Sequence, residues 1–309
     1  MSSLPPLVAL LGRRVTFALI LFATIYSLSP AIIAQTLPRP DHIVIVVEEN
    51  HSFGQIIGES EAPYLNSLVS EGTLLTSFFA LHHPSQPNYI VMFSGDRQGI
   101  VDNNCSANRP LIKNLSLGGQ LGRNGFSFKG YAEDLPQIGG TRGSSVCKSG
   151  KYVRRHAPWI NFADVPTIAS LPFSAFPTDF TTLPTVSFVI PNLDHDMHDG
   201  LIGTRRREGD DWLRENLNNY KEWAKTHNSL LIVTWDEDDK TFFFPKRITK
   251  PPENRVAAIF VGEMVKVGFK SDKQYDHVDL LRTIGEMYGL PPLPAKAYAK
   301  AKVIDDIWK

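Results

Sequence analysis

The sequence contains a series of apolar runs that end abruptly in polar residues. The first run, residues 42–47, reads His-Ile-Val-Ile-Val-Val and is followed at once by Glu48-Glu49-Asn50. A continuous Val/Ile run of this length is typical of a strand that is buried on both faces, as at the centre of a parallel sheet. Similar runs predict further strands at residues 73–81, 126–132, 185–190, 230–235 and 255–261.

Between these strands, apolar residues recur at helical spacing. The pattern predicts helices at residues 62–71, 85–95, 111–121, 210–227 and 278–289, and we expect Gly72 to cap the C-terminus of the first. Strands that alternate with helices favour an α/β fold with a mostly parallel sheet. No linker rich in Pro, Gly or Ser divides residues 38–309, so we expect them to form a single domain.

The first 34 residues have the layout of a secretory signal peptide. Arg13-Arg14 precede an apolar run at residues 15–26, and small residues precede a cleavage point after Ala34. The apolar run is shorter than the roughly 20 residues of a membrane span. We therefore expect a secreted or periplasmic protein with no stable membrane span after cleavage. An uncleaved N-terminal anchor is the alternative.

Charge and cysteine content narrow the class of protein further. The 309 residues include 32 basic and 32 acidic side chains, a balance that does not favour nucleic acid as a partner. The two cysteines, Cys105 and Cys147, have no Cys or His neighbour at the spacing of metal ligands. In an exported protein such a pair favours a disulfide over a metal site, with two free thiols as the alternative.

The polar residues after the apolar runs are the candidate chemistry. In a parallel sheet the carboxyl ends of the strands share one edge, where ligands bind. The clusters expected there are Glu48-Glu49-Asn50, His83 with Ser85, Asp196 with His198, and Asp236-Glu237. Each cluster alone has an ordinary explanation, such as a helix cap at Ser85 or a solvated turn at Asp236. Together they are more plausibly one site than four coincidences.

The residue types at this edge indicate a metal and a nucleophile. Carboxylate and amide oxygens suit one hard or borderline divalent cation, with Ca²⁺, Mg²⁺ and Zn²⁺ as candidates. Ser85 is expected at a helix N-terminus, where backbone N–H groups and the helix dipole favour a phosphate. These features predict metal-assisted hydrolysis of a phosphate ester through a serine nucleophile.

Several segments resemble a known family. Glu49-Asn50-His51-Ser52-Phe53 is similar to the E-N-x-S-F signature of the phosphoesterase family of the alkaline phosphatase superfamily, which contains bacterial acid phosphatases and phospholipases C. Five further segments resemble the secreted acid phosphatase branch, namely residues 62–66, 83–89, 191–192, 196–199 and 277–284. The resemblance implies an alkaline-phosphatase-like three-layer sandwich with a mostly parallel central sheet.

The resemblance also assigns roles to individual residues. It implies that Ser85 is the nucleophile and that the metal is bound by Glu49, Asn50, Ser85, Asp236 and Glu237. His198 and His277 are the candidates for the general acid. Substrate phosphate is expected to contact His83, Asn88 and Asp196.

Two departures from related patterns limit the alternatives. The phospholipases carry Gly-Gly after the acidic pair, whereas Asp238-Asp239 follow here. Tyr89 replaces the arginine of the sulfatase motif. The run Arg205-Arg206-Arg207 could attract anionic head groups, but a solvated charged loop is the favoured interpretation.

The function expected from the sequence is that of an exported, monomeric acid phosphatase. It would hydrolyse phosphate monoesters of small substrates, with phosphoinositides and other phospholipid head groups among the candidates. The first alternative is a phospholipase C-type phosphodiesterase. The second is a non-catalytic exported binding protein on the same fold, which would be expected to have lost Ser85 or the metal pairs.

Overall fold

Strand β1 (His42–Glu48) lies inside a nine-stranded sheet, with a parallel neighbour on each side. The computed structural model describes residues 1–2, 37–139, 146–201, 203–239 and 254–309. The predicted signal peptide therefore lies, apart from its first two residues, outside the described residues. On its two sides β1 pairs with β7 (Val186–Ile190) and β8 (Ser229–Trp235). Its residues from Ile43 to Glu48 are all buried, as the continuous Val/Ile run predicts.

The sheet contains both parallel and antiparallel pairs, and a single strand, β9, makes the antiparallel pairs in the main strand order. The strand order is β10-β2-β9-β8-β1-β7-β3-β6, with β11 beside β2. Strand β9 runs antiparallel to both β8 and β2, so β2 again points in the same direction as β8. The carboxyl ends of β2, β8, β1 and β7 therefore share one edge. The remaining bounds are β2 (Thr73–Phe79), β3 (Phe128–Ala132), β6 (Ser170–Pro172), β9 (Arg255–Gly262), β10 (Phe269–Ser271) and β11 (Tyr275–Asp276). A separate hairpin joins β4 (Lys148–Ser149) to β5 (Tyr152–Val153).

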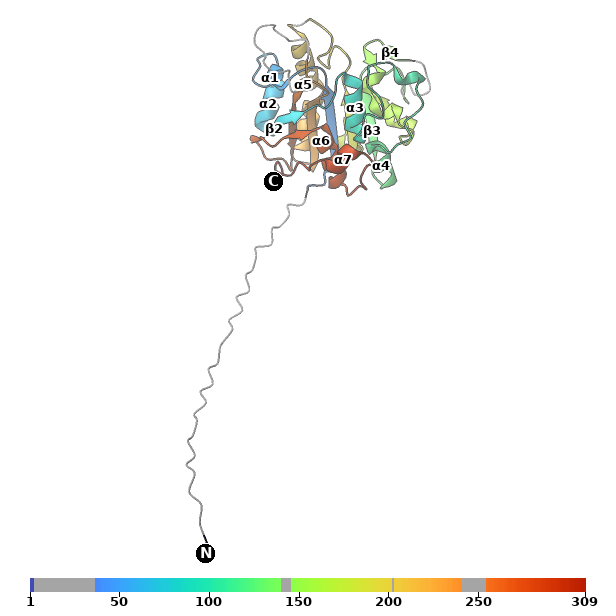
Figure 1. The fold of residues 1–309 in the computed structure, drawn as a ribbon. Coiled ribbons are helices and arrows are strands. Elements are labelled where there is room, and N and C mark those ends of the chain that lie inside the picture. Colours follow the sequence, from blue (N-terminus) through green and yellow to red (C-terminus); the bar gives the residue numbers. More distant parts are fainter. Residues whose placement is uncertain (3–36, 140–145, 202, 240–253) are drawn as a thin grey trace, which may run out of the picture. The chain divides into compact units, whose positions relative to one another are not determined.

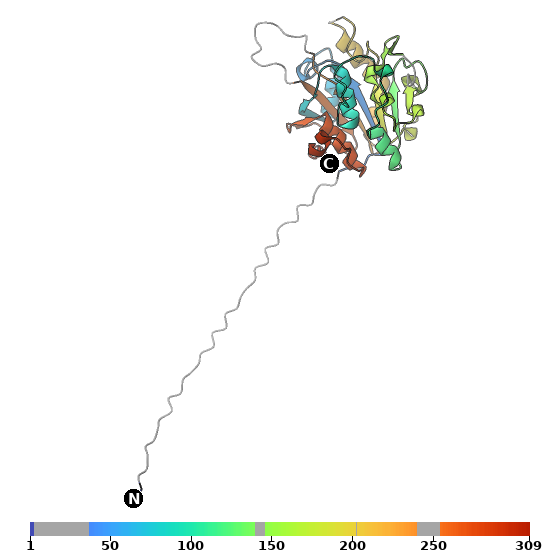
Figure 2. The same ribbon diagram turned by 45° about the vertical axis from the view of Figure 1, so that its right-hand side comes forward.

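Helices cover both faces of this sheet. On one face α3 (Ser85–Ser94) packs against α6 (His277–Met287), and Figures 1 and 2 show both in front of the strands. On the other face α5 (Arg205–Ala224) packs against β8 and against α2 (Pro63–Glu71). The shorter helices are α1 (Phe53–Ile56), α4 (Leu117–Arg123) and α7 (Lys296–Lys300). This is the α/β fold that the pattern of strands and helices predicts, in the three layers that the family resemblance implies.

Two helix starts differ from the prediction by five residues or more. Helix α4 begins at Leu117 rather than near residue 111, because Ser116 is its N-cap and the Ser116 hydroxyl accepts a hydrogen bond from the Gly119 N–H (3.1 Å). Helix α5 begins at Arg205, five residues before the predicted start at residue 210. Its first turn is charged and has no apolar spacing, so the hydrophobic pattern could not reveal it.

Gly72 ends α2, but for a different reason from the predicted C-cap. Its φ of −143° is extended rather than left-handed. A side chain at this position would collide with the backbone carbonyl of Phe260 in β9. Glycine is required here because β2 and β9 approach closely where α2 leads into β2.

Candidate active site

The turn after β1 brings the first pair of predicted ligands to the edge of the sheet. Asn50 has a φ of 51°, a left-handed conformation that asparagine tolerates better than most residues. Its backbone N–H donates to Asp236 Oδ1 at the end of β8 (3.2 Å), and its side-chain amide donates to Glu49 Oε2 (3.0 Å). The ends of two adjacent parallel strands are thus joined through this turn.

Ser85 lies where these strand ends meet the N-terminus of α3. It is the first residue of the helix and its side chain is buried, with 1% of the residue exposed. The hydroxyl is within hydrogen-bonding distance of Glu49 Oε2 and Glu237 Oε1, both 3.0 Å away. The structure therefore brings together Glu49, Asn50, Ser85, Asp236 and Glu237, as the strand-edge argument predicts.

These carboxylates form a buried group of like charges. Burial, followed by the charges of Glu49 and Glu237, raises the pKa of Asp236 well above its usual value. Burial acts on Glu49 in the same direction, but the charge of His156 and a hydrogen bond from it lower the pKa of Glu49 to about 2. Asp236 Oδ2 is buried without a hydrogen-bond partner among the described residues.

The chemistry of this donor set fits a divalent cation. Buried carboxylates crowded together need a compensating positive charge. The oxygen atoms offered by the acids, the Asn50 amide and the Ser85 hydroxyl are the ligands that hard cations prefer. Within the described residues, no three His, Cys, Asp or Glu side chains already stand at metal-coordinating positions. The donors are instead hydrogen-bonded to one another.

His156 is a residue of this site that the sequence did not reveal. It is fully buried, and its Nε2 lies 3.0 Å from Glu49 Oε1 while its Nδ1 lies 3.3 Å from Asp196 Oδ2. Its ring stacks on Tyr89 of α3, with centroids 4.9 Å apart. Although burial acts in the opposite direction, the charge of Glu49 and hydrogen bonds to both acids raise the pKa of His156. His156 stands in an irregular region without a recognisable pattern, so no sequence signal indicated it.

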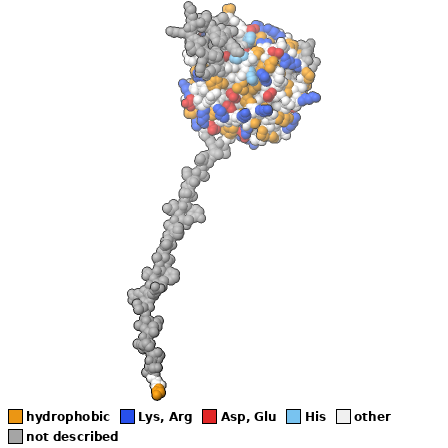
Figure 3. Space-filling view, in the orientation of Figure 1, with side chains coloured by type: hydrophobic (Ala, Val, Ile, Leu, Met, Phe, Trp, Pro, Cys, Tyr) orange, Lys and Arg blue, Asp and Glu red, His pale blue; other side chains and the backbone are white. Residues whose placement is uncertain are grey.

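A cavity of about 480 Å³ opens beside the buried carboxylates. Its described lining residues are Asn50, His83, Pro84, His198, Arg205, Glu237, Asp238 and Asp239. Figure 3 shows histidine side chains (pale blue) close together in the upper part of one face of the molecule. The cavity wall thus carries acidic side chains that follow β8 together with basic side chains from other segments.

Two predicted residues on this wall, His83 and His198, are held by acids. His83 Nδ1 contacts the Glu237 carboxylate, and His83 Nε2 lies 3.3 Å from Asp238 Oδ1. His198 Nδ1 lies 2.9 Å from Asp199 Oδ1, an arrangement that leaves its Nε2 for other contacts. Both imidazoles are therefore oriented by neighbouring carboxylates while they line the cavity.

Three other predicted residues occupy positions that differ from their expected roles. His277 is fully buried, its Nε2 lies 2.9 Å from the Trp235 carbonyl, and burial lowers its pKa to about 4. This neutral, enclosed imidazole does not suit the role of general acid. Asn88 is also buried, and its side chain bonds the backbone of Leu81 and His82, so it shapes the loop before Ser85 rather than binding substrate.

Asp196 contributes to the site from beneath the cavity wall. Its Oδ1 accepts from the His198 backbone N–H (2.9 Å), and its carbonyl accepts from the Glu49 N–H (2.8 Å). Burial raises the pKa of Asp196 to about 6. Asp196 therefore positions the segments that carry Glu49 and His198, where a direct contact with substrate phosphate had been expected.

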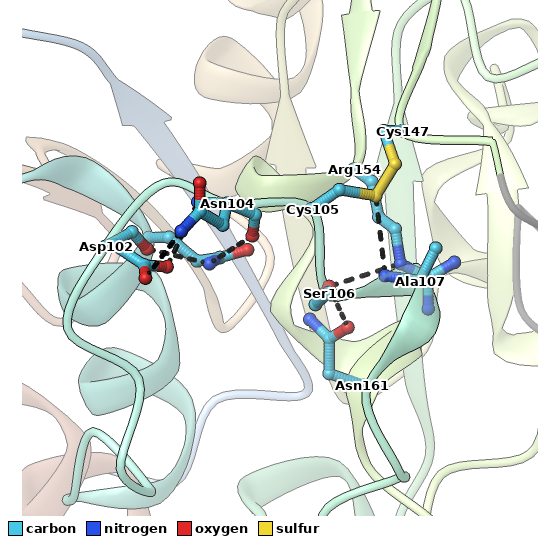
Figure 4. The surroundings of a disulfide bond; sticks show 9 residues. Asp102, Asn104, Cys105, Ser106, Ala107, Cys147, Arg154 and Asn161 are labelled. Carbon is cyan, nitrogen blue, oxygen red and sulfur yellow. Dashed lines mark hydrogen bonds between the residues drawn. A yellow bond between two sulfur atoms is a disulfide. The ribbon is translucent and has the colours of Figure 1, made fainter.

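Cys105 and Cys147 form the predicted disulfide, with their Cα atoms 5.5 Å apart. Figure 4 shows it beside Ser106, which donates to Asn161 Oδ1 (2.7 Å) and accepts from Arg154 Nε (3.2 Å). The disulfide thus joins two loops near the segment that carries His156. Among the described helices, none is long and apolar enough to cross a membrane.

A family model and relatives named as phosphatases match this sequence. The model of the Phosphoesterase family matches residues 59–291. A phosphatidylinositol-3-phosphatase of Mycobacterium tuberculosis is 46% identical over 278 residues, covering 89% of this chain and 85% of that protein. A phosphate-repressible acid phosphatase of Penicillium chrysogenum is 34% identical over 242 residues, covering 74% of this chain. This chain spans 55% of the length of that fungal enzyme.

A solved structure agrees in fold. The crystal structure of a protein in the alkaline phosphatase superfamily from Vibrio parahaemolyticus matches with a TM-score of 0.57 and 12% identity, over 83% of this chain and 68% of that one. At this level of identity the match shows the fold alone. The family model and the relatives together show that the chain belongs to the Phosphoesterase family, whose members hydrolyse phosphate esters.

Proposed function

We propose that this chain is an exported, metal-dependent acid phosphatase that hydrolyses phosphate monoesters through a phosphoserine intermediate. The observation that carries the proposal is the position of Ser85. Its hydroxyl lies 3.0 Å from each of two buried carboxylates, at a helix N-terminus beside a cavity lined by charged side chains. A serine that only capped a helix would not need buried acids from two strands around its hydroxyl.

The residues divide the work of the reaction. Ser85 Oγ attacks phosphorus and gives up its proton to a neighbouring carboxylate, while α3 presents its N-terminal N–H groups to the phosphate. Glu49, Asn50, Ser85, Asp236 and Glu237 would hold a divalent cation, which when bound supplies positive charge that favours the serine alkoxide and the developing phosphate charge. His198 donates a proton to the leaving oxygen, and water then hydrolyses the phosphoserine.

The proposed substrate class rests on one relative. Because the relative from Mycobacterium tuberculosis is named a phosphatidylinositol-3-phosphatase and matches over most of both chains, we include phosphoinositide monoesters among the substrates. The signal peptide at residues 1–34, export to the periplasm or medium, and a single phosphoesterase domain at residues 38–309 are parts of the same proposal.

The test compares two chromogenic substrates. Wild type and Ser85→Ala are assayed with p-nitrophenyl phosphate and p-nitrophenyl phosphorylcholine, with and without a chelator. We expect hydrolysis of the monoester by wild type only, and its loss on chelation. Full monoester activity in Ser85→Ala would remove the nucleophile assignment. Preference for the choline diester would favour a phospholipase C, and hydrolysis of neither would favour a binding protein.

A further inference from the structure

Arg205 is the described cavity residue with a permanent positive charge. The other basic groups that line the cavity, His83 and His198, are charged only when protonated. Arg205 is the first residue of α5, and its side chain is 14% exposed. The run of three arginines was expected to be a solvated loop, and for Arg205 the structure shows otherwise.

Two contacts fix the Arg205 guanidinium at the cavity wall. Its Nη2 donates to Asp239 Oδ2 (2.8 Å), and its Nη1 donates to the His198 carbonyl (3.5 Å). Within the part of the chain that the structure describes, these bonds use two of the five N–H donors of a guanidinium. A planar group held in this way, with donors remaining, is suited to binding phosphate oxygens through more than one hydrogen bond.

From this position we infer that Arg205 makes the site selective for phosphate monoesters over diesters. The inference rests on the proposed function. A monoester has three non-bridging oxygens and, above its second pKa of about 6, nearly two negative charges, whereas a diester has two such oxygens and one charge. A fixed cation at the wall of the cavity stabilises a bound monoester far more than a bound diester.

Asp239 makes the effect of removing Arg205 larger. Without the guanidinium, the Asp239 carboxylate would lose this positive neighbour at the cavity wall and would repel a dianion more strongly than a monoanion. Arg205 therefore acts in two ways on a bound monoester, by direct attraction and by neutralising a neighbouring acid. The double variant Arg205→Gln with Asp239→Asn removes both charges and the bond between α5 and the segment after β8. It therefore separates the two electrostatic effects from a purely structural role of that bond.

The experiment measures kcat/KM at pH 7 for p-nitrophenyl phosphate and its methyl diester, together with inhibition by inorganic phosphate. We expect Arg205→Gln to lower kcat/KM for the monoester by about 10²-fold, the scale found when one donor to a developing oxyanion is removed. The value for the diester should change by less than about 3-fold, and the inhibition constant of phosphate should rise. Adding Asp239→Asn should recover part of the monoester activity.

The matched control is Arg206→Gln, because Arg206 is the next residue and pairs with Glu61 instead of facing the cavity. It should leave all three measurements unchanged. An equal loss on both esters, or unchanged phosphate inhibition in Arg205→Gln, would overturn the inference while leaving the proposed function intact. The proposed function fails separately, if Ser85→Ala retains the activity of wild type on the monoester.

Discussion

His156 is the buried residue whose contacts bear most directly on the candidate ligands. It bridges Glu49 and Asp196 while stacking on Tyr89, and it contacts Glu49 Oε1 whereas Ser85 lies beside Oε2. Residues that orient a metal ligand commonly change metal affinity or activity by about 10- to 100-fold when replaced. We predict a loss of this size in His156→Gln, with more divalent metal required for half-maximal activity, measured by titrating the chelated enzyme.

His195→Gln is the matched control for that titration. His195 pairs with Glu133 at 2.9 Å and is not among the described cavity residues. It should leave the metal requirement unchanged. An unaltered metal titration in His156→Gln would show that His156 only fills space beneath the site.

His277 provides a prediction about stability and pH. Burial lowers its pKa to about 4, whereas the unfolded chain protonates near the ordinary value of 6.5. Between pH 6.5 and pH 4 the unfolded chain therefore binds a proton at His277 that the folded chain does not bind. The unfolding free energy is unaffected by this residue's titration above pH 6.5 and falls by about 3 kcal/mol as the pH drops to 4. His277→Gln should lose less unfolding free energy than wild type between pH 7 and pH 4.5, as measured by urea unfolding.

A variant whose stability should depend on pH in the opposite direction serves as the comparison. The hydrogen bond to Glu133, together with nearby acidic charge, raises the pKa of His195, so this residue contributes stability at low pH that is lost as the pH rises. His195→Gln should therefore lose more stability than wild type on acidification. Parallel pH profiles for wild type and His277→Gln would contradict the account of His277.

At the scale of residues, the sequence revealed those that follow strands. Glu49 and Asp236 could be placed together because each belongs to a polar cluster at the end of an apolar run. Ser85 could be placed with them because Pro87 and the following apolar residues indicate a helix start. His156 and Arg205 could not, since their roles depend on how a loop and a charged helix turn pack against those strands. The burial of His277 likewise depends on its contact with Trp235, which is 42 residues away.

At the scale of elements, α5 stabilises the start of α2 through one side chain. Both oxygens of Asp210 accept backbone hydrogen bonds, from Tyr64 N (2.9 Å) and Leu65 N (2.8 Å). These N–H groups belong to the first turn of α2 and have no partner within the helix. Asp210→Ala should lower the unfolding free energy by about 1–2 kcal/mol, the scale of a lost helix cap.

Asp211 is a suitable control because it is adjacent but pairs with Arg214 at the surface. Surface pairs of this kind contribute about 0–1 kcal/mol, so Asp211→Ala should unfold close to wild type in urea. Equal destabilisation by the two substitutions would mean that the Asp210 bonds do not hold α2.

Element types were predictable from the sequence, whereas one strand direction was not. The runs at residues 42–47 and 230–235 became neighbouring parallel strands, as buried Val/Ile-rich segments favour. The run at residues 255–261 became β9, which is equally apolar but antiparallel to both neighbours. Periodicity reports burial and not direction. The carboxyl ends of β2 and β8 still share one edge, because both strands run antiparallel to β9 and therefore point in the same direction.

At the scale of the whole molecule, the disulfide Cys105–Cys147 closes a long segment beside the site. Its cysteines are 42 residues apart, and closing a loop of that length restricts the unfolded chain by about 4 kcal/mol. The double variant Cys105→Ser, Cys147→Ser should lose stability on that scale in urea unfolding. A matching loss in wild type after reduction would confirm the cause, and an unchanged midpoint in both would contradict it.

The central claim is that Ser85 carries the phosphoryl group during turnover. The most direct measurement is an acid quench of the metal-loaded enzyme during hydrolysis of p-nitrophenyl phosphate, followed by mass spectrometry of its peptides. The account predicts one phosphoryl group on Ser85, and a loss of at least about 10³-fold in kcat for Ser85→Ala. An unphosphorylated Ser85 together with full activity of Ser85→Ala would contradict it.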